Sequence, residues 1–553
     1  MGDSYREFLV ENLAEAHRKG ELALFVGAGV SKAAGLPGLP DILNELSKRF
    51  FVYKGEGMDF TLYTQHCANE GQEASVKLCI CNYLKEKEPT SRDLIDKIVK
   101  LNFRTIWSTN YDSLIEDCHK EKHVRLSPIK NERDLISARG AHAGVLYKIH
   151  GDIDSPADIV ITKSDFEDFN KPLMLSFLKR DLITVPFLFI GYSFDDNLIL
   201  RQIAEVRKCM GGLLQKHYAI FKRETPKTDS ATSASKSAKG ETSQANKASS
   251  IVTSPSHTAE TVHMQTSGRT QYEVQSLHEA QCQCTPRKTN EASDPQTLFI
   301  KDLKHRYGIE SLLVDEFSDI PKVLEEIYAK STAKNVFISG SFYQMDSKSF
   351  AFADELSAQL TRALLEEGYN IYTGIGKGLG ALITGYAHEY LATHEISTYE
   401  ANKRLVMRPY PFHLKLTESQ KEEFRQHMQS DCSAAIFLFG QSKSTSERKE
   451  KYAKPSDMSG HYSEGVFQEF CIADAEHRLV IPIPETGYEA SIIYTKMYTT
   501  SKRDANKYSY FNFSEFSPER PYEYKALSDE ERARRIVRSI IKLLNEASQN
   551  CKV

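Results

Sequence analysis

The sequence predicts an α/β protein with two Rossmann-like domains, each built on a mostly parallel sheet. Short apolar runs that are rich in β-branched and aromatic residues alternate along the chain with segments of helical periodicity. Glycine or polar residues directly follow many of these runs, as they do at the ligand-binding edge of an open α/β sheet. The chain has 553 residues, which is too long for a single hydrophobic core.

The N-terminal domain is predicted to cover residues 1–330. Residues 21–30 (ELALFVGAGV) are typical of a strand that runs into a glycine turn, and a helix with an apolar face follows at 42–50. Further strands are predicted in the segments FRTIWSTN, AGVLYKIH and TVPFLFIG, with helical periodicity between them. Because strands and helices alternate, we expect a mostly parallel sheet with helices on both faces.

A Ser- and Thr-rich insertion at 226–295 interrupts this domain. Nearly a third of its residues are Ser or Thr, and Tyr272 is its only aromatic residue, so disorder is expected. The strand-like segment HYAIF lies before it, and a helix (TLFIKDLKHRYG) and a strand (ESLLVDE) lie after it. These three segments predict one βαβ step, which tolerates a long surface insertion because loop-closure entropy grows slowly with length.

The second domain is predicted to cover residues 331–553. Its strands are expected in the segments NVFISGSF, YNIYTGIG, CSAAIFLFG and HRLVIPIP, and long amphipathic helices separate them. The C-terminal segment DEERARRIVRSIIKLLNEA has the regular apolar spacing of one such helix. We therefore expect a second α/β layer of the nucleotide-binding type.

Charge and composition exclude several classes of protein. A formal net charge of -4 gives no electrostatic argument for a nucleic-acid partner, and no apolar run approaches the length of a membrane span. The ten cysteines contain no CxxC pair, so we expect no zinc knuckle and no other metal site. Scattered thiols of this kind are typical of a reduced, cytoplasmic protein.

A glycine turn follows the first predicted strand, in the segment FVGAGVS. Gly27 and Gly29 remove side chains where a backbone has to approach a pyrophosphate, and free N–H groups there could hold the anion. The alternative is an ordinary strand-to-helix turn that needs glycine for positive φ.

Polar residues follow three more strands of the same domain. Asn110 can hydrogen-bond a ribose or a carboxamide and Asp112 can accept from an amide or hydroxyl, although both also suit an Asx turn. His150 could activate a ribose hydroxyl or water, although a single histidine at such a place is more often structural. Gly191 and Ser193 belong either to the same pocket or to a simple turn. Because the carboxyl ends of parallel strands share one edge, together these residues predict a nucleotide pocket.

The second domain carries its own glycine-rich loop, GIGKGLG at 374–380. The backbone of Gly374 and Gly376 could cradle a phosphate and Lys377 could add charge, whereas the alternative is a connection that allows close packing. The loop is not a Walker A motif, because neither Ser nor Thr follows the lysine. Further candidates for phosphate or ribose recognition, each with the alternative of a solvated charge, are Arg408, Arg425 and Glu469.

The N-terminal motifs GAGVS, STNYD, IHGD and GYSFDD resemble those of the sirtuin-like superfamily, over roughly residues 10–225 and 296–330. The resemblance implies that Asn110 and His150 are catalytic and that Asp112 holds the nicotinamide carboxamide. It also implies that NAD+ binds at Gly27, Ala28, Gly29, Ser31, Gly191 and Ser193. The chain lacks the paired CxxC motifs of protein-deacylating sirtuins, and GLPGLPDIL replaces their GxPDFR-like loop. Both departures favour water as the acceptor of ADP-ribose.

The segments GSF, GIGKGLG and EGVFQEF of the second domain resemble the SLOG family of nucleotide-sensing domains. A sirtuin-like domain followed by SLOG is similar to the effector family of Thoeris anti-phage defence. This resemblance implies a cytoplasmic homotetramer or filament that depletes cellular NAD+ and is activated by a cyclic ADP-ribose isomer from a TIR-domain enzyme. The residues implied to line the signal pocket are Ser341, Gly374, Gly376, Lys377, Arg408, Arg425 and Glu469.

We therefore expect an NAD+ glycohydrolase that is gated by its second domain, since a ligand shifts an equilibrium only through its differential affinity. One alternative is an NAD-dependent protein deacylase, against which the missing zinc pairs argue. The other is a non-catalytic nucleotide sensor or scaffold, against which the presence of both Asn110 and His150 argues.

Overall fold

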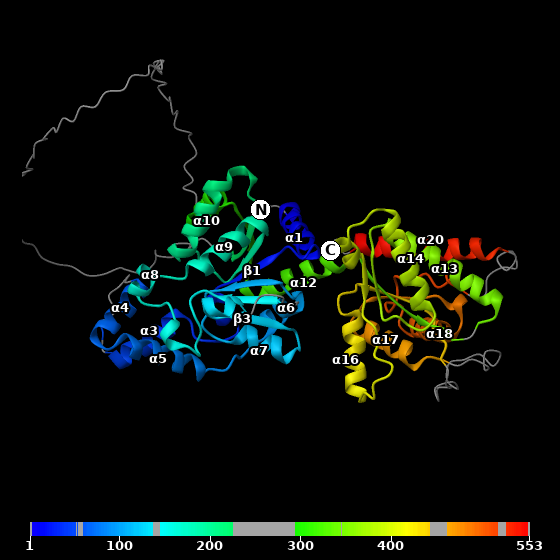
Figure 1. The fold of residues 1–553 in the computed structure, drawn as a ribbon, viewed down its shortest axis with the longest axis horizontal. Coiled ribbons are helices and arrows are strands. Elements are labelled where there is room, and N and C mark those ends of the chain that lie inside the picture. Colours follow the sequence, from blue (N-terminus) through cyan, green and yellow to red (C-terminus); the bar gives the residue numbers. More distant parts are fainter. Residues whose placement is uncertain are drawn as a thin grey trace, which may run out of the picture. The chain divides into compact units, whose positions relative to one another are not determined.

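The computed structural model describes residues 3–50, 52, 59–136, 144–224, 294–343, 345–442, 462–517 and 527–550 (Figure 1). One compact unit contains Met1–Arg223 and Asp302–Val553, and a second contains Glu224–Lys301. The predicted disordered insertion lies outside the described residues, except for its last two positions. Among the described helices, none is long and apolar enough to cross a membrane.

A seven-stranded sheet, parallel throughout, organises the N-terminal half, in the order β3-β4-β2-β1-β5-β6-β7. This sheet confirms the predicted α/β class. The chain turns from one side of β1 to the other between β4 and β5, and such a switch point is where open α/β sheets bind ligands. The strands are β1 (Ala23–Val26), β2 (Thr105–Ser108), β3 (Leu126–Ile129), β4 (Gly144–Lys148), β5 (Phe187–Ile190), β6 (His217–Lys222) and β7 (Ile309–Val314).

Helices cover both faces of this sheet, so the central strands β1 and β5 are apolar at every position. Leu24 and Val26 of β1 point into a cluster formed with α1, α6, α7 and α12, whereas Phe25 lies on the opposite face against Phe189, with 5.0 Å between ring centroids. On that second face Trp107 contacts α9, which packs on α10. The helices are α1 (Asp3–Arg18), α2 (Ala28–Ala33), α6 (Asp93–Leu101), α7 (Leu114–Glu121), α8 (Lys163–Glu167), α9 (Pro172–Thr184), α10 (Asn197–Met210), α11 (Pro295–Asp302) and α12 (Ile320–Thr332).

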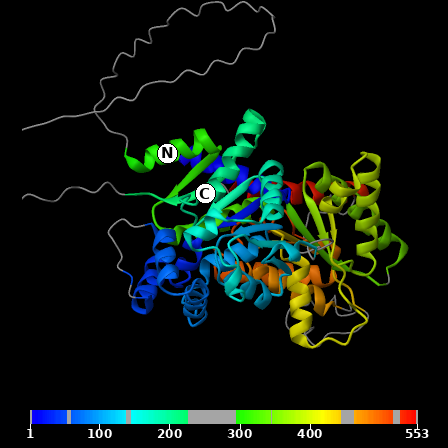
Figure 2. The same ribbon diagram turned by 60° about the vertical axis from the view of Figure 1, so that its left-hand side comes forward.

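Three helices between β1 and β2 form a cluster of their own, blue in Figures 1 and 2. They are α3 (Leu39–Phe50), α4 (Phe60–Glu70) and α5 (Glu73–Lys85). Their apolar residues pack with Ile159 and Ile161, and Thr64 donates a hydrogen bond to the Ile161 carbonyl at 2.8 Å. The segment that follows His150 is thereby fixed to this cluster.

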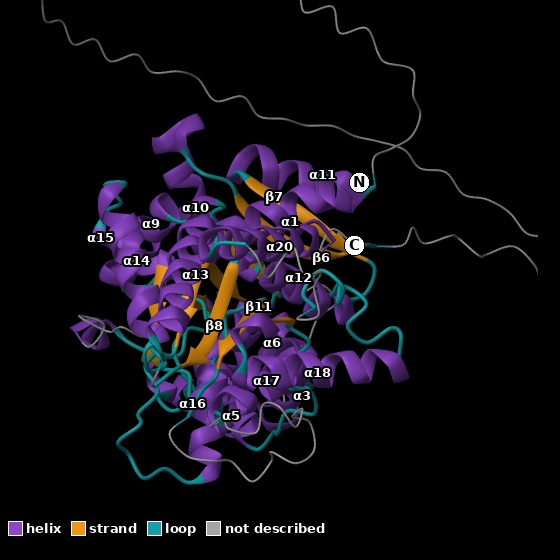
Figure 3. Cartoon of the chain, turned by 90° about the vertical axis from the view of Figure 1, so that its right-hand side faces the viewer, coloured by secondary structure: helices purple, strands orange, loops and turns teal. Residues whose placement is uncertain are grey.

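A five-stranded sheet organises the C-terminal half, again parallel throughout, in the order β10-β9-β8-β11-β12, with β8 beside β11 (Figure 3). Its strands are β8 (Asn335–Ser341), β9 (Asn370–Thr373), β10 (Leu405–Met407), β11 (Ala434–Phe439) and β12 (Leu479–Pro482). Helix α13 packs on α14 and α20, while α17 and α18 pack on β11 and β12. The helices are α13 (Ser347–Glu366), α14 (Leu379–Thr393), α15 (Thr398–Arg404), α16 (Glu418–Gln429), α17 (Glu464–Ala475), α18 (Tyr488–Arg503) and α20 (Asp529–Asn550).

The sequence prediction missed two strands, β3 and β10. Both lie at a sheet edge, where fewer neighbours demand apolar residues. Strand β3 contains Pro128, which cannot donate a ladder hydrogen bond and is tolerated at an edge. The predicted strand–helix–strand order around the insertion is confirmed by β6, α11 and β7, because β6 and β7 pair in parallel from His217 to Lys222.

Candidate functional site

Four loops meet at the carboxyl edge of the first sheet, after the neighbouring strands β4, β2, β1 and β5. They contain the residues that the sequence singled out: the glycine turn at Gly27, the Asn110 loop, the His150 loop and the Gly191 turn. Polar contacts join each loop to the next.

The glycines after β1 and β5 allow two backbones to touch. The Gly29 N–H donates to the Gly191 carbonyl at 2.8 Å, and a Cβ at Gly27 would lie 2.4 Å from that same oxygen. Gly191 has a φ of +66°. The Gly27 N–H is also engaged, with the Ile190 carbonyl at 3.0 Å. The sequence had suggested that these two N–H groups are free to hold an anion. Both are instead bonded to backbone carbonyls, and they hold the loops together.

Asn110 offers a buried acceptor at this edge. Its Nδ2 group donates to the Gly27 carbonyl at 3.1 Å and to Ser31 Oγ at 2.9 Å, which uses both of its hydrogens. Ser31 Oγ in turn donates to Asp112 Oδ2 at 2.7 Å. The Oδ1 atom of Asn110 is buried and has no hydrogen-bond partner among the described residues. In this arrangement Asn110 can accept a hydrogen bond from a hydroxyl or water but has none left to donate.

A buried lysine at the end of β4 binds the backbone of the Asn110 loop. Lys148 Nζ donates to the carbonyls of Tyr111 (3.0 Å) and Asp112 (2.6 Å) and forms ion pairs with Glu116 (3.0 Å) and Asp152 (2.5 Å). The lysine side chain is 1% exposed and that of Asp152 is 0% exposed. Because charges this deeply buried need partners, the cluster fixes the loop that carries Asn110 to the end of β4.

His150 lies beside a carboxylate that the sequence analysis did not name. Its Nε2 atom is 3.1 Å from Asp196 Oδ2, and the two side chains are 7% and 12% exposed. Burial raises the pKa of Asp196, but His150 and the N–H groups of Leu198 and Ile199 lower it more, so its pKa lies below the ordinary value. Asp196 was visible as the last letter of GYSFDD, yet only the tertiary structure shows that it reaches His150.

Three of the predicted residues lie at the surface of this edge: Ala28, Gly29 and Ser193 are exposed. Among the described residues, no group of three or more His, Cys, Asp or Glu side chains could hold a metal ion.

Close backbone approaches also shape the second predicted site. A Cβ at Gly376 would lie 1.9 Å from the Gly340 carbonyl oxygen, so only glycine fits against the end of β8. Ser341 donates through Oγ to the Gln441 carbonyl at 2.9 Å, and Lys377 Nζ lies 4.8 Å from the centre of the Tyr343 ring. Ser341, Gly376 and Lys377 are therefore gathered at the carboxyl edge of the second sheet.

Glu469 and Arg425 form the buried charged part of this region. Ser339 donates to Glu469 Oε2 at 2.6 Å, and burial raises the pKa of Glu469 to about 7 despite the opposing effects of Ser339 and Arg425. The Arg425 guanidinium stacks on Tyr410, 4.7 Å from the ring centre. It is 7% exposed, and its Nε and Nη1 atoms have no hydrogen-bond partner in the described part of the chain. An unsatisfied buried guanidinium is suited to bind a phosphate. Sequence analysis missed Ser339 and Tyr410, which carry no motif signal.

Arg408 does not join this group. Its guanidinium donates to Ser430 Oγ at 3.0 Å and pairs with Asp431, whose carbonyl accepts a bond from Asn335 at the start of β8. Its nitrogens are thus engaged toward the amino end of the sheet, so its predicted role in ligand binding stays a prediction.

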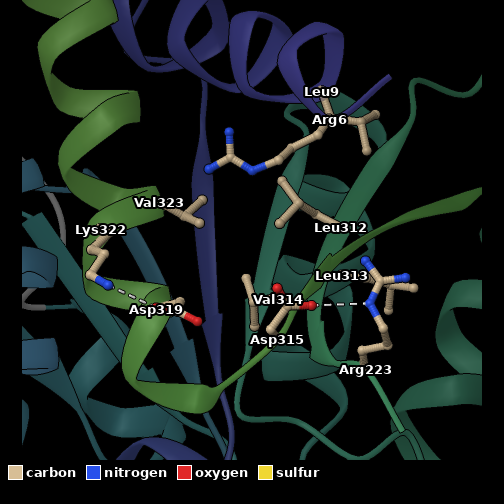
Figure 4. Close-up of a pocket in the computed structure, with 10 residues that line it drawn as sticks. All are labelled: Arg6, Leu9, Arg223, Leu312, Leu313, Val314, Asp315, Asp319, Lys322 and Val323. Atoms are coloured by element: carbon tan, nitrogen blue, oxygen red, sulfur yellow. Dashed lines mark hydrogen bonds and ion pairs between the residues drawn. The ribbon is translucent and has the colours of Figure 1, made fainter. Parts of the chain in front are cut away.

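A cavity of about 370 Å³ opens beside α1, β7 and α12 (Figure 4). None of its lining residues belongs to the motifs. Its cations are already paired, Arg6 with Glu326 at 2.7 Å, Arg223 with Asp315 at 3.1 Å and Lys322 with Asp319 at 2.9 Å. Since the cations that line the cavity are already paired, we assign the site to the loops above and not to this cavity.

Comparison with known proteins agrees with the two sheets. Residues 104–242 match the sequence model of the SIR2-like domain, and residues 319–547 match that of the Sir2- and TIR-associating SLOG family. The chain is 27% identical over 515 residues to NAD(+) hydrolase ThsA of Cytobacillus dafuensis, which covers 89% of this chain and 88% of that protein. It is 24% identical over 497 residues to NAD(+) hydrolase ThsA of Bacillus cereus (strain MSX-D12), covering 89% of each. It is also 25% identical over 211 residues to "Defense-associated sirtuin 2" of Bacillus subtilis, over 36% of this chain and 21% of that protein.

Proposed function

We propose that this chain, which has a SIR2-like domain followed by a SLOG domain, is an NAD+ hydrolase that releases nicotinamide and ADP-ribose. The observation that carries the proposal is the pairing of an acceptor-only Asn110 with a buried His150 at one edge of one sheet. The similarity to ThsA proteins over 89% of the chain supports the same activity.

In the proposed reaction the bond between C1′ of the nicotinamide ribose and the nicotinamide nitrogen breaks. The electron pair leaves with nicotinamide, which becomes neutral, and C1′ acquires oxocarbenium character. Water adds to C1′, and its proton passes to His150 and then to solvent. Asn110 Oδ1 accepts a hydrogen bond from the water or from a ribose hydroxyl and so orients it. Asp112 holds the nicotinamide carboxamide, and the turns at Gly27 and Gly191 contact the rest of the dinucleotide.

We further propose that the SLOG domain binds the activating ligand, a cyclic ADP-ribose isomer. Arg425 is the residue we assign to its phosphates, because its guanidinium is buried and has two nitrogens without partners among the described residues. Glu469 and the Ser339 hydroxyl oxygen would accept hydrogen bonds from ribose hydroxyls, because the Ser339 hydrogen is already donated to Glu469. The glycine-rich loop from Gly374 would lie along the ligand.

The setting of the activity follows from the same resemblance. We propose a cytoplasmic homo-oligomer, a tetramer or filament, that depletes NAD+ during phage infection. The name of the matched family, Sir2- and TIR-associating SLOG, agrees with a TIR-domain enzyme as the source of the signal.

Nicotinamide release from NAD+ tests the proposal. The full chain is assayed with and without each cyclic ADP-ribose isomer, first without and then with an acylated peptide. We expect release without peptide, stimulation by one isomer, and loss of release in Asn110→Ala and His150→Ala. Activity that survives both substitutions would refute the catalytic assignment. Release that requires the peptide would identify a deacylase, and absence of release under every condition would identify a sensor.

A matched pair of variants tests the second domain. Arg425→Ala should abolish stimulation by the isomer while leaving any basal release unchanged. Arg408→Ala should weaken stimulation less, because that guanidinium is already paired with Asp431. If Arg425→Ala is stimulated like the wild-type protein, the assignment of Arg425 is wrong.

A further inference from the structure

The contact between His150 and Asp196 has a consequence for the proposed reaction. We propose that Asp196 is a positioning residue that binds Nε2 of His150, so that Nδ1 is the nitrogen that takes the proton. This inference rests on the proposed NAD+ hydrolysis and assigns a proton acceptor within it.

The contact is not a by-product of sheet pairing. His150 follows β4 and Asp196 follows β5, and these strands are separated in the sheet by β2 and β1. At the usual spacing of neighbouring strands, their ends lie roughly 14 Å apart. The two loops therefore reach over the ends of β2 and β1 to bring Nε2 and Oδ2 within 3.1 Å.

Asp196 uses its two oxygens for two tasks. Oδ1 accepts from the Leu198 and Ile199 N–H groups, at 2.9 and 3.4 Å, and so caps the N-terminus of α10. Oδ2 has no partner among the described residues that satisfies hydrogen-bond geometry, and it faces His150. The cap fixes the carboxylate, and the free oxygen is presented to the imidazole.

The surroundings preserve the charge of this carboxylate. The phenols of Tyr111 and Tyr192 lie within electrostatic reach of Asp196, and burial raises the pKa of both, so they stay neutral near pH 7. Asp195, the adjacent carboxylate, is exposed. The His150 and Phe166 rings pack in a T-shaped arrangement, with 5.3 Å between centroids, and Lys171 Nζ donates to the Ile149 carbonyl at 2.8 Å.

A carboxylate on Nε2 selects the tautomer of the neutral ring. With the proton on Nε2, this N–H group faces the Asp196 carboxylate, and the lone pair of Nδ1 is left for the proton of water or of a ribose hydroxyl. When Nδ1 takes that proton, the imidazolium forms beside an anion that stabilises it. Loss of the carboxylate would leave neither the tautomer of the neutral ring nor the imidazolium with a partner at Nε2.

Asp196→Asn tests the inference, since asparagine retains an oxygen for the α10 cap and removes the charge. We expect kcat for nicotinamide release to fall about 10-fold to 1000-fold. Asp195→Asn, which removes the exposed neighbouring carboxylate, should leave kcat unchanged.

The fold is checked by the fluorescence of Trp107, the single tryptophan of the chain. If Asp196→Asn does not fold, Asp196→Ser, which can also cap the helix, replaces it. A kcat within twofold of wild type, or a fall in kcat in a protein whose wild-type ring is protonated on Nδ1, would overturn the inference. Nitrogen-15 histidine spectra, assigned with His150→Gln, give a readout independent of activity: the wild-type ring should carry its proton on Nε2. If the wild-type protein releases no nicotinamide, the proposed function fails, whereas a ring protonated on Nδ1 in the wild-type protein refutes the role of Asp196.

Discussion

Replacement of Lys148 by methionine should unfold the N-terminal domain more easily and impair its site. The side chain is 1% exposed, and Nζ serves four acceptors between 2.5 and 3.0 Å. Methionine fills similar volume but leaves the buried carboxylates of Glu116 and Asp152 without this cation. Breaking a buried pair by removing one partner costs about 3–5 kcal/mol, so we expect a loss of that size in the free energy of unfolding. Because the Tyr111 and Asp112 carbonyls also lose their donor, nicotinamide release should fall as well.

The fluorescence of Trp107 makes the measurement specific to this domain. It is the only tryptophan, it is buried, it stacks on Tyr147 with 4.2 Å between ring centroids, and its Nε1 donates to Asp181 at 3.0 Å. Urea unfolding of the full chain, followed by this signal, therefore reports on the first sheet and not on the second. The extrapolated free energies of the variant and wild-type proteins give the cost.

Two further variants separate the buried charge from general damage. Lys130→Met removes a cation that is 27% exposed and also binds Asp152, at 2.8 Å, but leaves Lys148 in place, so its cost should be about 1 kcal/mol. Adding Glu116→Gln to Lys148→Met removes one of the orphaned carboxylates and should recover about 1–2 kcal/mol. If Lys148→Met costs less than 1 kcal/mol, or no more than Lys130→Met, the network does not hold the loop as we argue.

The remaining predictions concern one glycine and one carboxyl group. Gly191→Ala places a Cβ 2.6 Å from Val30 N at a φ of +66° and should lower the free energy of unfolding by about 2–4 kcal/mol, measured by Trp107 fluorescence. Gly211→Ala, at a φ of +57° with no atom within 4 Å of the added Cβ, should lower it by about 1 kcal/mol. Equal losses would contradict the close packing of the turns. Burial raises the pKa of Glu469 from 4.5 to about 7, so the folded state binds the extra proton and stability should fall as pH rises between these values. Glu469→Gln should therefore unfold at a higher temperature than wild type at pH 8, with a smaller difference at pH 5, by calorimetry; a difference independent of pH would refute the raised pKa.

The central strands β1 and β5 could be predicted from sequence, because a strand that is buried on both faces has an uninterrupted run of apolar residues. Phe25 and Leu24 lie on opposite faces of β1, and both are fully buried. The edge strands β3 and β10 carry no such signal, since an edge has only one neighbour and tolerates Pro128. Segment position was thus predictable for the strands that organise the site.

The roles within the site could be predicted less well. Arg408 and Arg425 carry no sequence signal that separates their roles. Whether a guanidinium is paired, as Arg408 is with Asp431, or buried and unsatisfied, as Arg425 is, depends on residues distant in the chain. The glycines of GAGVS were expected to expose N–H groups to a pyrophosphate, whereas two of those groups bind neighbouring backbone. Sequence gives residue types at a sheet edge, and tertiary contacts decide which of their atoms remain available.

A site made from the ends of separate strands needs bonds that run across the loops, because the sheet ladder stops where the loops begin. The Gly29–Gly191 bond joins the β1 loop to the β5 loop, Asn110 joins the β2 loop to Gly27, and Lys148 joins the β4 strand to the β2 loop. The His150–Asp196 contact joins the β4 loop to the β5 loop and closes the series into a ring. Each link except the first is made by a polar side chain that is largely buried, so loss of one leaves an unpaired group and strains the next. The residues that hold the ring are therefore expected to affect catalysis through the geometry of Asn110 and His150, even where they touch no substrate.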